Sequence, residues 1–163
     1  GMEAYGLSQR LGSSVDEAAE ILESYFAAFP AVRAYMDRTV DEARQKGYTE
    51  TLFGRRRRIP ELSSPNYNVR QAGERQAMNA GIQGRAADIF KVALIRIDEG
   101  LRASGAASEL ILQVHDEVIL EVPPDEMHDV EALVRAEMTG AYDLRVELAV
   151  DVADGATWAD AKG

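Results

Sequence analysis

The sequence contains no cysteine and only two histidines, and both scarcities narrow what the protein can be. Without cysteine it can form neither disulfides nor a thiolate metal site, so nothing indicates secretion and we expect a cytoplasmic protein. No apolar run approaches the roughly 20 residues that span a bilayer. No basic-then-apolar leader opens the chain either, so we expect no membrane partner.

Aromatic residues are also few, at 7%, but apolar side chains as a whole are not scarce. The chain has 163 residues, of which 46% are apolar and 28% are charged. This is the balance of one soluble globular domain that can bury a core. We find no internal repeat, low-complexity tract or linker.

Positive charge is scarce overall but concentrated in the middle of the chain. The formal net charge is −10, yet the segment from Arg44 to Arg96 has 11 basic and four acidic residues. The segment is therefore +7 and the remainder −17. A basic middle between acidic ends can hold a polyanion in one groove. A chance distribution of charged residues over helices and loops explains the same pattern equally well. Charge alone therefore does not decide between a polyanion-binding groove and chance.

The order of the expected elements indicates an α+β fold. Ser14 and Glu17 have the spacing of a capping box before an amphipathic helix that reaches Pro30, and a second helix ends at Gly47. After the second helix, the pattern predicts two short strands around Gly54 and a loop over 63–68. A long helix should follow from Val69 to about Leu101, interrupted around Gly81 and Gly84. The expected elements after it are a strand pair (Leu110 to Val114 and Val118 to Val122), a helix over Asp125 to Met138 and a last strand near Val146 to Val152. Helices first and antiparallel strands later are typical of the α+β class.

Three ionisable residues, His115, Asp116 and Glu117, occupy the point where the strand pair must reverse. Asp tolerates the left-handed conformation and can hydrogen-bond its own backbone, so a purely structural turn is one interpretation. His and Glu are not turn formers, however. A carboxylate at the tip of a rigid hairpin presents oxygen ligands to a hard cation such as Mg²⁺. Glu117 is either part of that site or a solvated neighbour.

A polar stripe runs along the expected long helix. Arg75, Asn79 and Gln83 are spaced i, i+4 and i+8, so they share one face. We expect the opposite side to be apolar, through Met78, Ile82, Ala86, Ile89, Phe90, Ala93 and Ile97. A solvated stripe is one interpretation. The other is that these donors reach the minor groove of DNA, whose acceptors occur at every base pair.

Three segments in this order and spacing carry a resemblance: "ETLFGRRRRIPEL", "ERQAMNAGIQGRAADIFK" and "LQVHDEVILEV". They closely resemble the C-terminal part of the polymerase domain of the DNA polymerase I family, or family A. The resemblance extends over essentially the whole chain, from "YGLSQRLG" to "TWADAK". It implies a fragment of a right-hand polymerase fold, with fingers-proximal helices and a small hairpin over about residues 1–60. A long helix and an antiparallel palm-type sheet, whose hairpin carries the catalytic aspartate, would occupy about 61–163.

The resemblance also implies roles for individual residues. Asp116 resembles the metal-binding palm aspartate, and Glu117 its adjacent catalytic carboxylate. His115 resembles a residue that contacts the primer terminus. The expected DNA-contacting residues are Arg75, Asn79, Gln83, His115, Gln113, Arg55 and Arg56. The family commonly has proline at the position of Gly81, and a small Ser or Thr at that of Arg85.

The implied activity is template-directed DNA synthesis with two Mg²⁺ ions, primer-template DNA and deoxynucleoside triphosphates. The family's first palm aspartate and its nucleotide-binding fingers residues belong to an upstream remainder of the chain. We therefore expect this chain alone to be inactive. One alternative is a non-catalytic DNA-binding module or an inactivated polymerase remnant. A metal phosphohydrolase of the His-Asp kind needs several histidines, and this chain has only His115 and His128. Within the family, the compact loops favour a bacterial repair and replication enzyme over bacteriophage or organellar ones.

Overall fold

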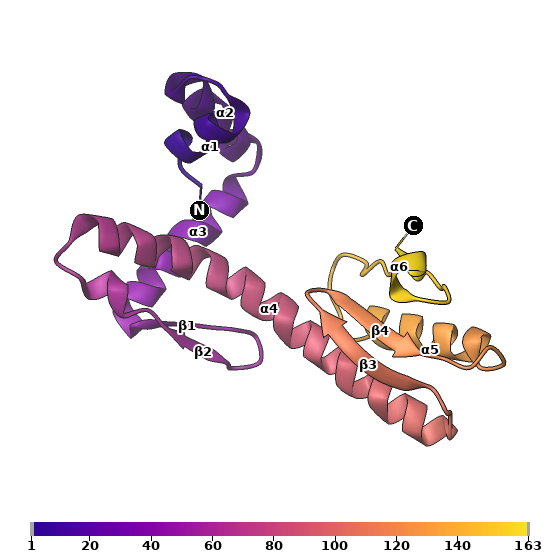
Figure 1. The fold of residues 1–163 in the computed structure, drawn as a ribbon. Coiled ribbons are helices and arrows are strands. Elements are labelled where there is room, and N and C mark those ends of the chain that lie inside the picture. Colours follow the sequence, from indigo (N-terminus) through magenta and orange to yellow (C-terminus); the bar gives the residue numbers. More distant parts are fainter. Residues whose placement is uncertain (1, 163) are drawn as a thin grey trace. The chain divides into compact units, whose positions relative to one another are not determined.

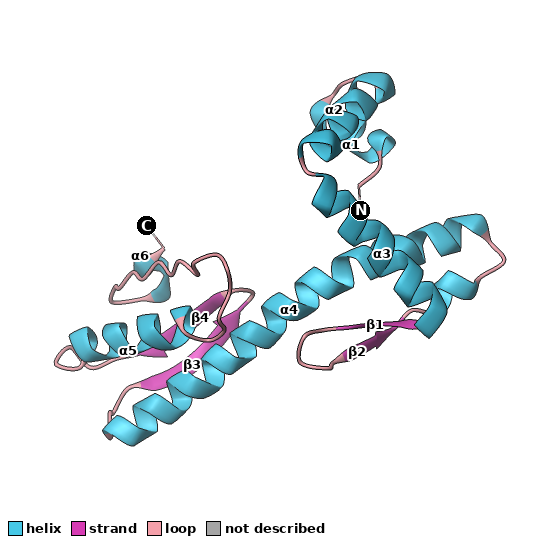
Figure 2. Cartoon of the chain, turned by 180° about the vertical axis from the view of Figure 1, so that it is seen from behind, coloured by secondary structure: helices cyan, strands magenta, loops and turns pink. Residues whose placement is uncertain are grey.

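The computed structural model describes residues 2–162, which form two compact units. The first extends to Arg85 and the second begins at Ala86, so the long helix α4 contributes to both. The fold is α+β with two small antiparallel sheets, as expected (Figures 1 and 2). In chain order the elements are α1 (Ala4–Leu11), α2 (Val15–Ala28), α3 (Pro30–Lys46), β1 (Tyr48–Glu50), β2 (Arg56–Arg58), the 3-10 helix η1 (Pro60–Ser63), α4 (Tyr67–Ser104), β3 (Glu109–Val114), β4 (Glu117–Glu121), α5 (Met127–Thr139) and α6 (Trp158–Ala161).

The boundaries of α2 and α3 follow from local chemistry that the sequence already displays. The hydroxyl of Ser14 accepts the backbone N–H of Glu17 at 3.2 Å, and the carboxylate of Glu17 accepts the backbone N–H of Ser14 at 2.9 Å. The predicted capping box is therefore present, and it satisfies two amides that α2 leaves unpaired. Pro30 opens α3 and Gly47 ends it with φ 76°. Only glycine adopts this left-handed conformation without strain.

The core of the first unit joins α3, η1 and the first part of α4. Its buried members are Val40, Ala43, Ile59, Leu62 and Ala77. The β1–β2 hairpin leaves this core at its edge, with Tyr48 opposite Arg58 and Glu50 opposite Arg56. The hairpin predicted around Gly54 is thus confirmed, and it presents four consecutive arginines next to α4.

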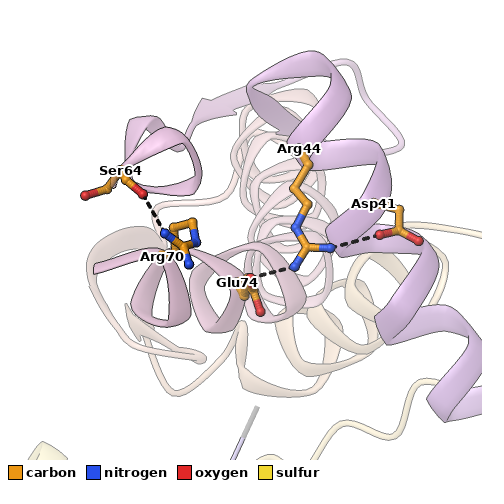
Figure 3. A network of polar contacts seen from close by, with 5 residues as sticks. All are labelled: Asp41, Arg44, Ser64, Arg70 and Glu74. Carbon is orange, nitrogen blue, oxygen red and sulfur yellow. Dashed lines mark hydrogen bonds and ion pairs between the residues drawn. The ribbon is translucent and has the colours of Figure 1, made fainter. Parts of the chain in front are cut away.

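Two arginines tie the segments around this core together (Figure 3). The guanidinium of Arg44 donates to Glu74 on α4 at 2.6 Å and to Asp41 on its own helix at 3.2 Å. The hydrogen bond to Glu74 raises the pKa of Arg44 above its ordinary value. Arg70 donates to the carbonyl oxygen of Ser64 at 3.0 Å. The start of α4 is therefore held to α3 and to the end of η1.

The predicted interruption of the long helix is wrong, because α4 continues through both glycines. A Cβ at Gly81 would lie 2.6 Å from the hydroxyl of Tyr35, and one at Gly84 would lie 2.5 Å from a methyl group of Thr51. These glycines therefore permit close packing of α4 against α3 and the hairpin. Tertiary packing of this kind outweighs the weak helix propensity of glycine.

The predicted apolar side of α4 is only partly correct. Ala93 and Ile97 are buried as expected, but Ile82 is 60% exposed and Ala86 is exposed as well. In the first unit the helix buries small residues instead, Ala77 and Ala80. Close contact between helices requires small side chains at the interface. The periodicity of large apolar residues therefore does not indicate which face of α4 is buried here.

The second unit packs the β3–β4 hairpin and α5 against the later part of α4. Ile97, Leu101, Val130 and Val134 are its buried core, with Leu110, Leu120 and Val122 packed against them. The register of the two strands shifts between Leu110 and Leu112, so Ile111 is an extra residue on β3. Such a bulge twists the hairpin locally. The helix predicted over Asp125 to Met138 is present as α5.

The last predicted strand, near Val146 to Val152, is not formed. Within residues 2–162 this segment belongs to no sheet, and Val146 is 71% exposed. Its alternating apolar residues suit a strand, but a strand also needs a neighbour with free backbone groups. Here the carbonyl of Val150 accepts a hydrogen bond from Arg135 at 2.6 Å.

Candidate functional site

The β3–β4 turn projects the candidate catalytic residues from the rigid hairpin. Val114 pairs with Glu117, so His115 and Asp116 alone form the turn and Glu117 is the first residue of β4. His115 has φ 54° and is the one non-glycine residue in 2–162 with positive φ. The sequence assigned left-handed tolerance to Asp116, whereas the structure places His115 in that conformation.

Gln113 supports this turn from β3. Its side-chain amide donates to the carbonyl of His115 at 2.6 Å. A hydrogen bond to the backbone within the turn restrains a conformation that is otherwise unfavourable for a non-glycine residue. The structure therefore gives Gln113 a local role, and its expected contact with DNA stays a prediction.

The two carboxylates of the turn differ in their surroundings. Both Asp116 and Glu117 are exposed. Among the described residues Asp116 has no side-chain hydrogen bond or ion pair, while Glu117 pairs with Lys162 at 3.1 Å. An exposed, unshared carboxylate next to a second one is a suitable oxygen donor for a divalent cation. No group of three or more metal-ligating side chains occurs among residues 2–162, and a metal site at the turn stays a prediction.

The polar stripe of α4 lies in the first unit, on one exposed face. Arg75 and Asn79 line a hollow of about 500 Å³, together with Met2, Glu3 and Gly6. Gln83 is exposed one turn further along. The stripe and the β3–β4 turn belong to different compact units.

Arg75 has a partner that the sequence did not reveal. Its guanidinium donates to the carboxylate of Glu3 at 3.1 Å, across 72 positions of sequence. The side chains of Arg75 and Glu3 are 42% and 63% exposed, so the pair is weak and can open to a stronger anion. No spacing rule links residues this far apart, so the sequence did not predict the ion pair between Arg75 and Glu3.

The arginines of the β1–β2 hairpin are mostly engaged within the first unit. Arg55 donates to the carbonyl of Gly84 at 3.0 Å, and Arg57 donates to Gln76 at 3.2 Å. Arg56 donates to Glu50 at 2.5 Å, and this hydrogen bond raises the pKa of Arg56. The guanidinium of Arg56 also lies 4.9 Å from the ring centroid of Tyr48. Part of the basic run therefore holds the hairpin on α4.

None of the described helices is both long enough and apolar enough to cross a membrane. Comparison with known proteins decides the family. The model of "DNA polymerase family A" matches residues 1–160.

The chain belongs to DNA polymerase family A.

Relatives within family A are similar over nearly the whole chain. It is 53% identical over 158 residues to DNA polymerase I of Mycobacterium tuberculosis, which covers 97% of this chain and 18% of that protein. It is 48% identical over 162 residues to DNA polymerase I of Streptococcus pneumoniae, covering 99% of this chain and 18% of that protein. The chain thus spans less than a fifth of the length of these curated relatives.

The family A fold is also matched by a solved structure, the POL domain of Pol1 from M. smegmatis in complex with DNA primer-template and dNTP. The TM-score is 0.96 and the sequence identity 49%, over 100% of this chain and 29% of that chain. The expected family and the expected fragment of a polymerase fold are therefore confirmed. The individual site residues stay predictions.

Proposed function

We propose that this chain is part of a template-directed DNA polymerase of the bacterial repair and replication type. Its match over 100% of its length to a polymerase domain that holds primer-template DNA and dNTP carries this conclusion. The partners would be primer-template DNA, deoxynucleoside triphosphates and the remainder of the polymerase chain. Residues 1–60 would be fingers-proximal and residues 61–163 would contain the long helix and the palm.

Asp116 is the residue to which we assign the metal site, with Glu117 as its accessory carboxylate. The exposed and unshared carboxylate of Asp116 fits a hard divalent cation. A pair of such ions, Mg²⁺ in this proposal, supplies activation of the attacking oxygen and neutralisation of the departing pyrophosphate. Asp116 contributes one carboxylate, and the hairpin braced by Gln113 fixes where it points. Further ligands must come from outside residues 2–162.

The exposed face of α4 would bind the duplex near the growing end. Asn79 and Gln83 are uncharged donors suited to the nearly degenerate acceptors of the minor groove. Arg75 would exchange its exposed ion pair with Glu3 for a contact to DNA. His115, at the tip of the turn, would contact the primer terminus. Gln113, Arg55 and Arg56 would add further contacts to the DNA backbone.

Replacing Asp116 by alanine in the intact polymerase tests the proposal. Because a lost metal ligand removes transition-state stabilisation without changing the duplex-binding surface, we expect incorporation to fall by at least about a hundred-fold. Affinity for primer-template should stay within about two-fold. Single-nucleotide incorporation rates and primer-template dissociation constants are the measurements.

Two controls sharpen this test. Asp129→Ala removes an exposed carboxylate from α5 and should leave the incorporation rate unchanged, whereas Glu117→Ala should cause a smaller loss than Asp116→Ala. Incorporation by Asp116→Ala within a few-fold of the unmodified enzyme would contradict the assignment. An intact parent that binds primer-template but incorporates nothing would instead identify an inactivated remnant.

A further inference from the structure

A lysine directly after the C-terminal helix α6 pairs with Glu117, the candidate carboxylate that follows the His115–Asp116 turn. Lys162, directly after α6, places its Nζ 3.1 Å from Oε1 of Glu117 and 4.8 Å from the ring centroid of Trp158. The lysine therefore joins the first residue of α6 to the first residue of β4. Both elements belong to the second unit.

The segment around α6 is itself well defined. The hydroxyl of Thr157 accepts the backbone N–H of Asp160 at 3.3 Å and donates to its carboxylate at 2.7 Å. A Cβ at Gly155 would lie 2.8 Å from the backbone nitrogen of Ala161, so the chain folds tightly back on α6. The backbone that carries Lys162 is therefore held by these contacts around α6.

The Lys162–Glu117 pair is too exposed to matter much for stability. The side chain of Lys162 is 53% exposed and that of Glu117 is 45% exposed. Ion pairs of this exposure contribute little to folding. The pair does restrain one oxygen of Glu117, while Oε2 has no partner among the described residues. Its effect is therefore to orient the carboxylate next to Asp116.

We propose that Lys162 is a positioning residue for nucleotide addition: with Trp158 it holds the carboxylate of Glu117 at the base of the His115–Asp116 turn. The proposal rests on the proposed function of Asp116 and Glu117.

The test is a double-mutant cycle in the intact polymerase. Lys162→Met should lower kcat by about three- to five-fold, the most that an exposed ion pair supports. The KM for dNTP and the affinity for primer-template should stay within about two-fold. Lys162→Arg, which keeps the charge, should restore most of the rate. In a Glu117→Gln background, Lys162→Met should cause no further loss, because the partner is already gone.

Arg102→Met is the matched control, since Arg102 also forms an exposed ion pair in the second unit, with Asp98 on its own helix at 2.9 Å. It should leave kcat unchanged. An unchanged kcat for Lys162→Met, or the same loss with and without Glu117, would overturn the proposal. If Glu117→Gln alone matches the unmodified enzyme, the proposed role of Glu117 fails. If Glu117→Gln is slow and Lys162→Met is not, only the positioning role fails.

A second measurement needs neither metal nor turnover. Amide hydrogen exchange over residues 157–162 of the metal-free polymerase should become faster by no more than about five-fold in Lys162→Met, the most that an exposed ion pair supports, and equally faster in Glu117→Gln. The double variant should exchange no faster than either single one. Trp158→Phe, which keeps an aromatic ring, should have a smaller effect than Trp158→Ala. Faster exchange in Lys162→Met alone would show that Glu117 is not its partner and would overturn the proposal.

Discussion

Gly73 and Gly81 both lie on α4, and at each of them a neighbouring group occupies the space that a side chain would need. The two neighbouring groups differ in how easily they can move. A Cβ at Gly73 would lie 2.9 Å from Cβ of Glu61 and 3.0 Å from the backbone nitrogen of Leu62. A Cβ at Gly81 would meet only the hydroxyl of Tyr35, at the end of a long side chain. A backbone neighbour cannot move without disturbing η1, whereas a tyrosine hydroxyl can turn aside.

We therefore expect Gly73→Ala to destabilise the first unit and Gly81→Ala to leave it nearly unchanged. Overpacking costs about 1–3 kcal/mol, and replacing glycine by alanine in a helix returns up to about 1 kcal/mol. The net cost at Gly73 should be about 1–2 kcal/mol, and that at Gly81 within about 0.5 kcal/mol of zero. Amide hydrogen exchange of α4 in the intact polymerase measures the local opening free energy. Equal effects at both positions would show that the stiffness of the neighbour does not matter.

Single residues also show how far the sequence could predict the site. The motif predicts that Asp116 and Glu117 lie where the strand pair reverses, and the structure exposes both there, while their catalytic roles stay predictions. The positive φ of His115 was not predicted, since it depends on strand register and on the hydrogen bond from Gln113. Glu3 and Lys162 were not predicted because their partners lie far away in sequence.

At the scale of elements, local chemistry predicted most boundaries and tertiary contacts decided the rest. The capping box of α2 and the glycine after α3 each depend on a few adjacent residues, so the sequence predicts these helix boundaries. The continuity of α4 is not, because it depends on Tyr35 and Thr51 packing against its glycines. The missing strand near Val146 follows the same logic, since alternation does not reveal whether a partner strand is present.

The exposed face of α4 gives a prediction for the intact polymerase. If Asn79 and Gln83 bind minor-groove acceptors, alanine at either should slow extension on every template sequence alike and alter discrimination between matched and mismatched primer ends. Arg75→Ala should additionally reduce the salt dependence of binding by up to about one unit of slope. Extension rates from both kinds of end, and affinity as a function of salt, are the measurements. Arg58→Ala, which removes an exposed charge from the β1–β2 hairpin, should change only the salt slope. Asn79 and Gln83 variants that behave as the unmodified enzyme would indicate a solvated stripe.

The loop before β3 gives a prediction about pH. Glu126 accepts hydrogen bonds from the Ser108 hydroxyl at 2.5 Å and from the backbone N–H groups of Ala107 and Ser108 at 2.8 and 3.0 Å. The hydroxyl contributes most to lowering the pKa of Glu126, followed by the N–H of Ala107. A carboxyl group with a lowered folded-state pKa stabilises the fold above its ordinary pKa, and this contribution is lost as pH falls through the folded-state value.

We therefore expect Glu126→Gln to be less stable than the unmodified enzyme near neutral pH, with the difference shrinking in acid. Opening of the segment 105–110, measured by hydrogen exchange between about pH 7 and about pH 3.5, reports this difference. Glu99→Gln removes an exposed carboxylate of α4 and is the control. A difference between Glu126→Gln and the unmodified enzyme that stays constant over this range would exclude the carboxylate as its cause.

At the scale of the whole molecule, basic residues are concentrated between acidic ends. The segment from Arg44 to Arg96 carries +7 and the rest −17, and the structure places this segment on α3, the β1–β2 hairpin and α4. Several arginines of this segment form hydrogen bonds that hold these elements together. The segment's net charge therefore overstates the number of arginines that are available to DNA. All five of the arginines Arg44, Arg55, Arg56, Arg58 and Arg85 are exposed, but the first three donate hydrogen bonds within the protein.

We expect residues 1–163 expressed alone to incorporate no nucleotide, because residues 2–162 contain no group of three metal-ligating side chains. A primer-extension assay with Mg²⁺ should give the same background for this chain and for its Asp116→Ala variant. Circular dichroism should first verify that both contain the expected helix. Extension above that background would show that the chain holds a complete active site.

The left-handed turn residue restricts evolution at position 115 in two independent ways. The backbone at φ 54° admits glycine, asparagine or aspartate most easily and penalises β-branched side chains. The proposed contact with a primer terminus would instead require a side chain that reaches the primer and donates a hydrogen bond, which glycine cannot provide. Histidine at this position would combine a tolerated left-handed backbone with a ring nitrogen that can reach and donate, so glycine would meet only the first requirement and a β-branched residue would fail it.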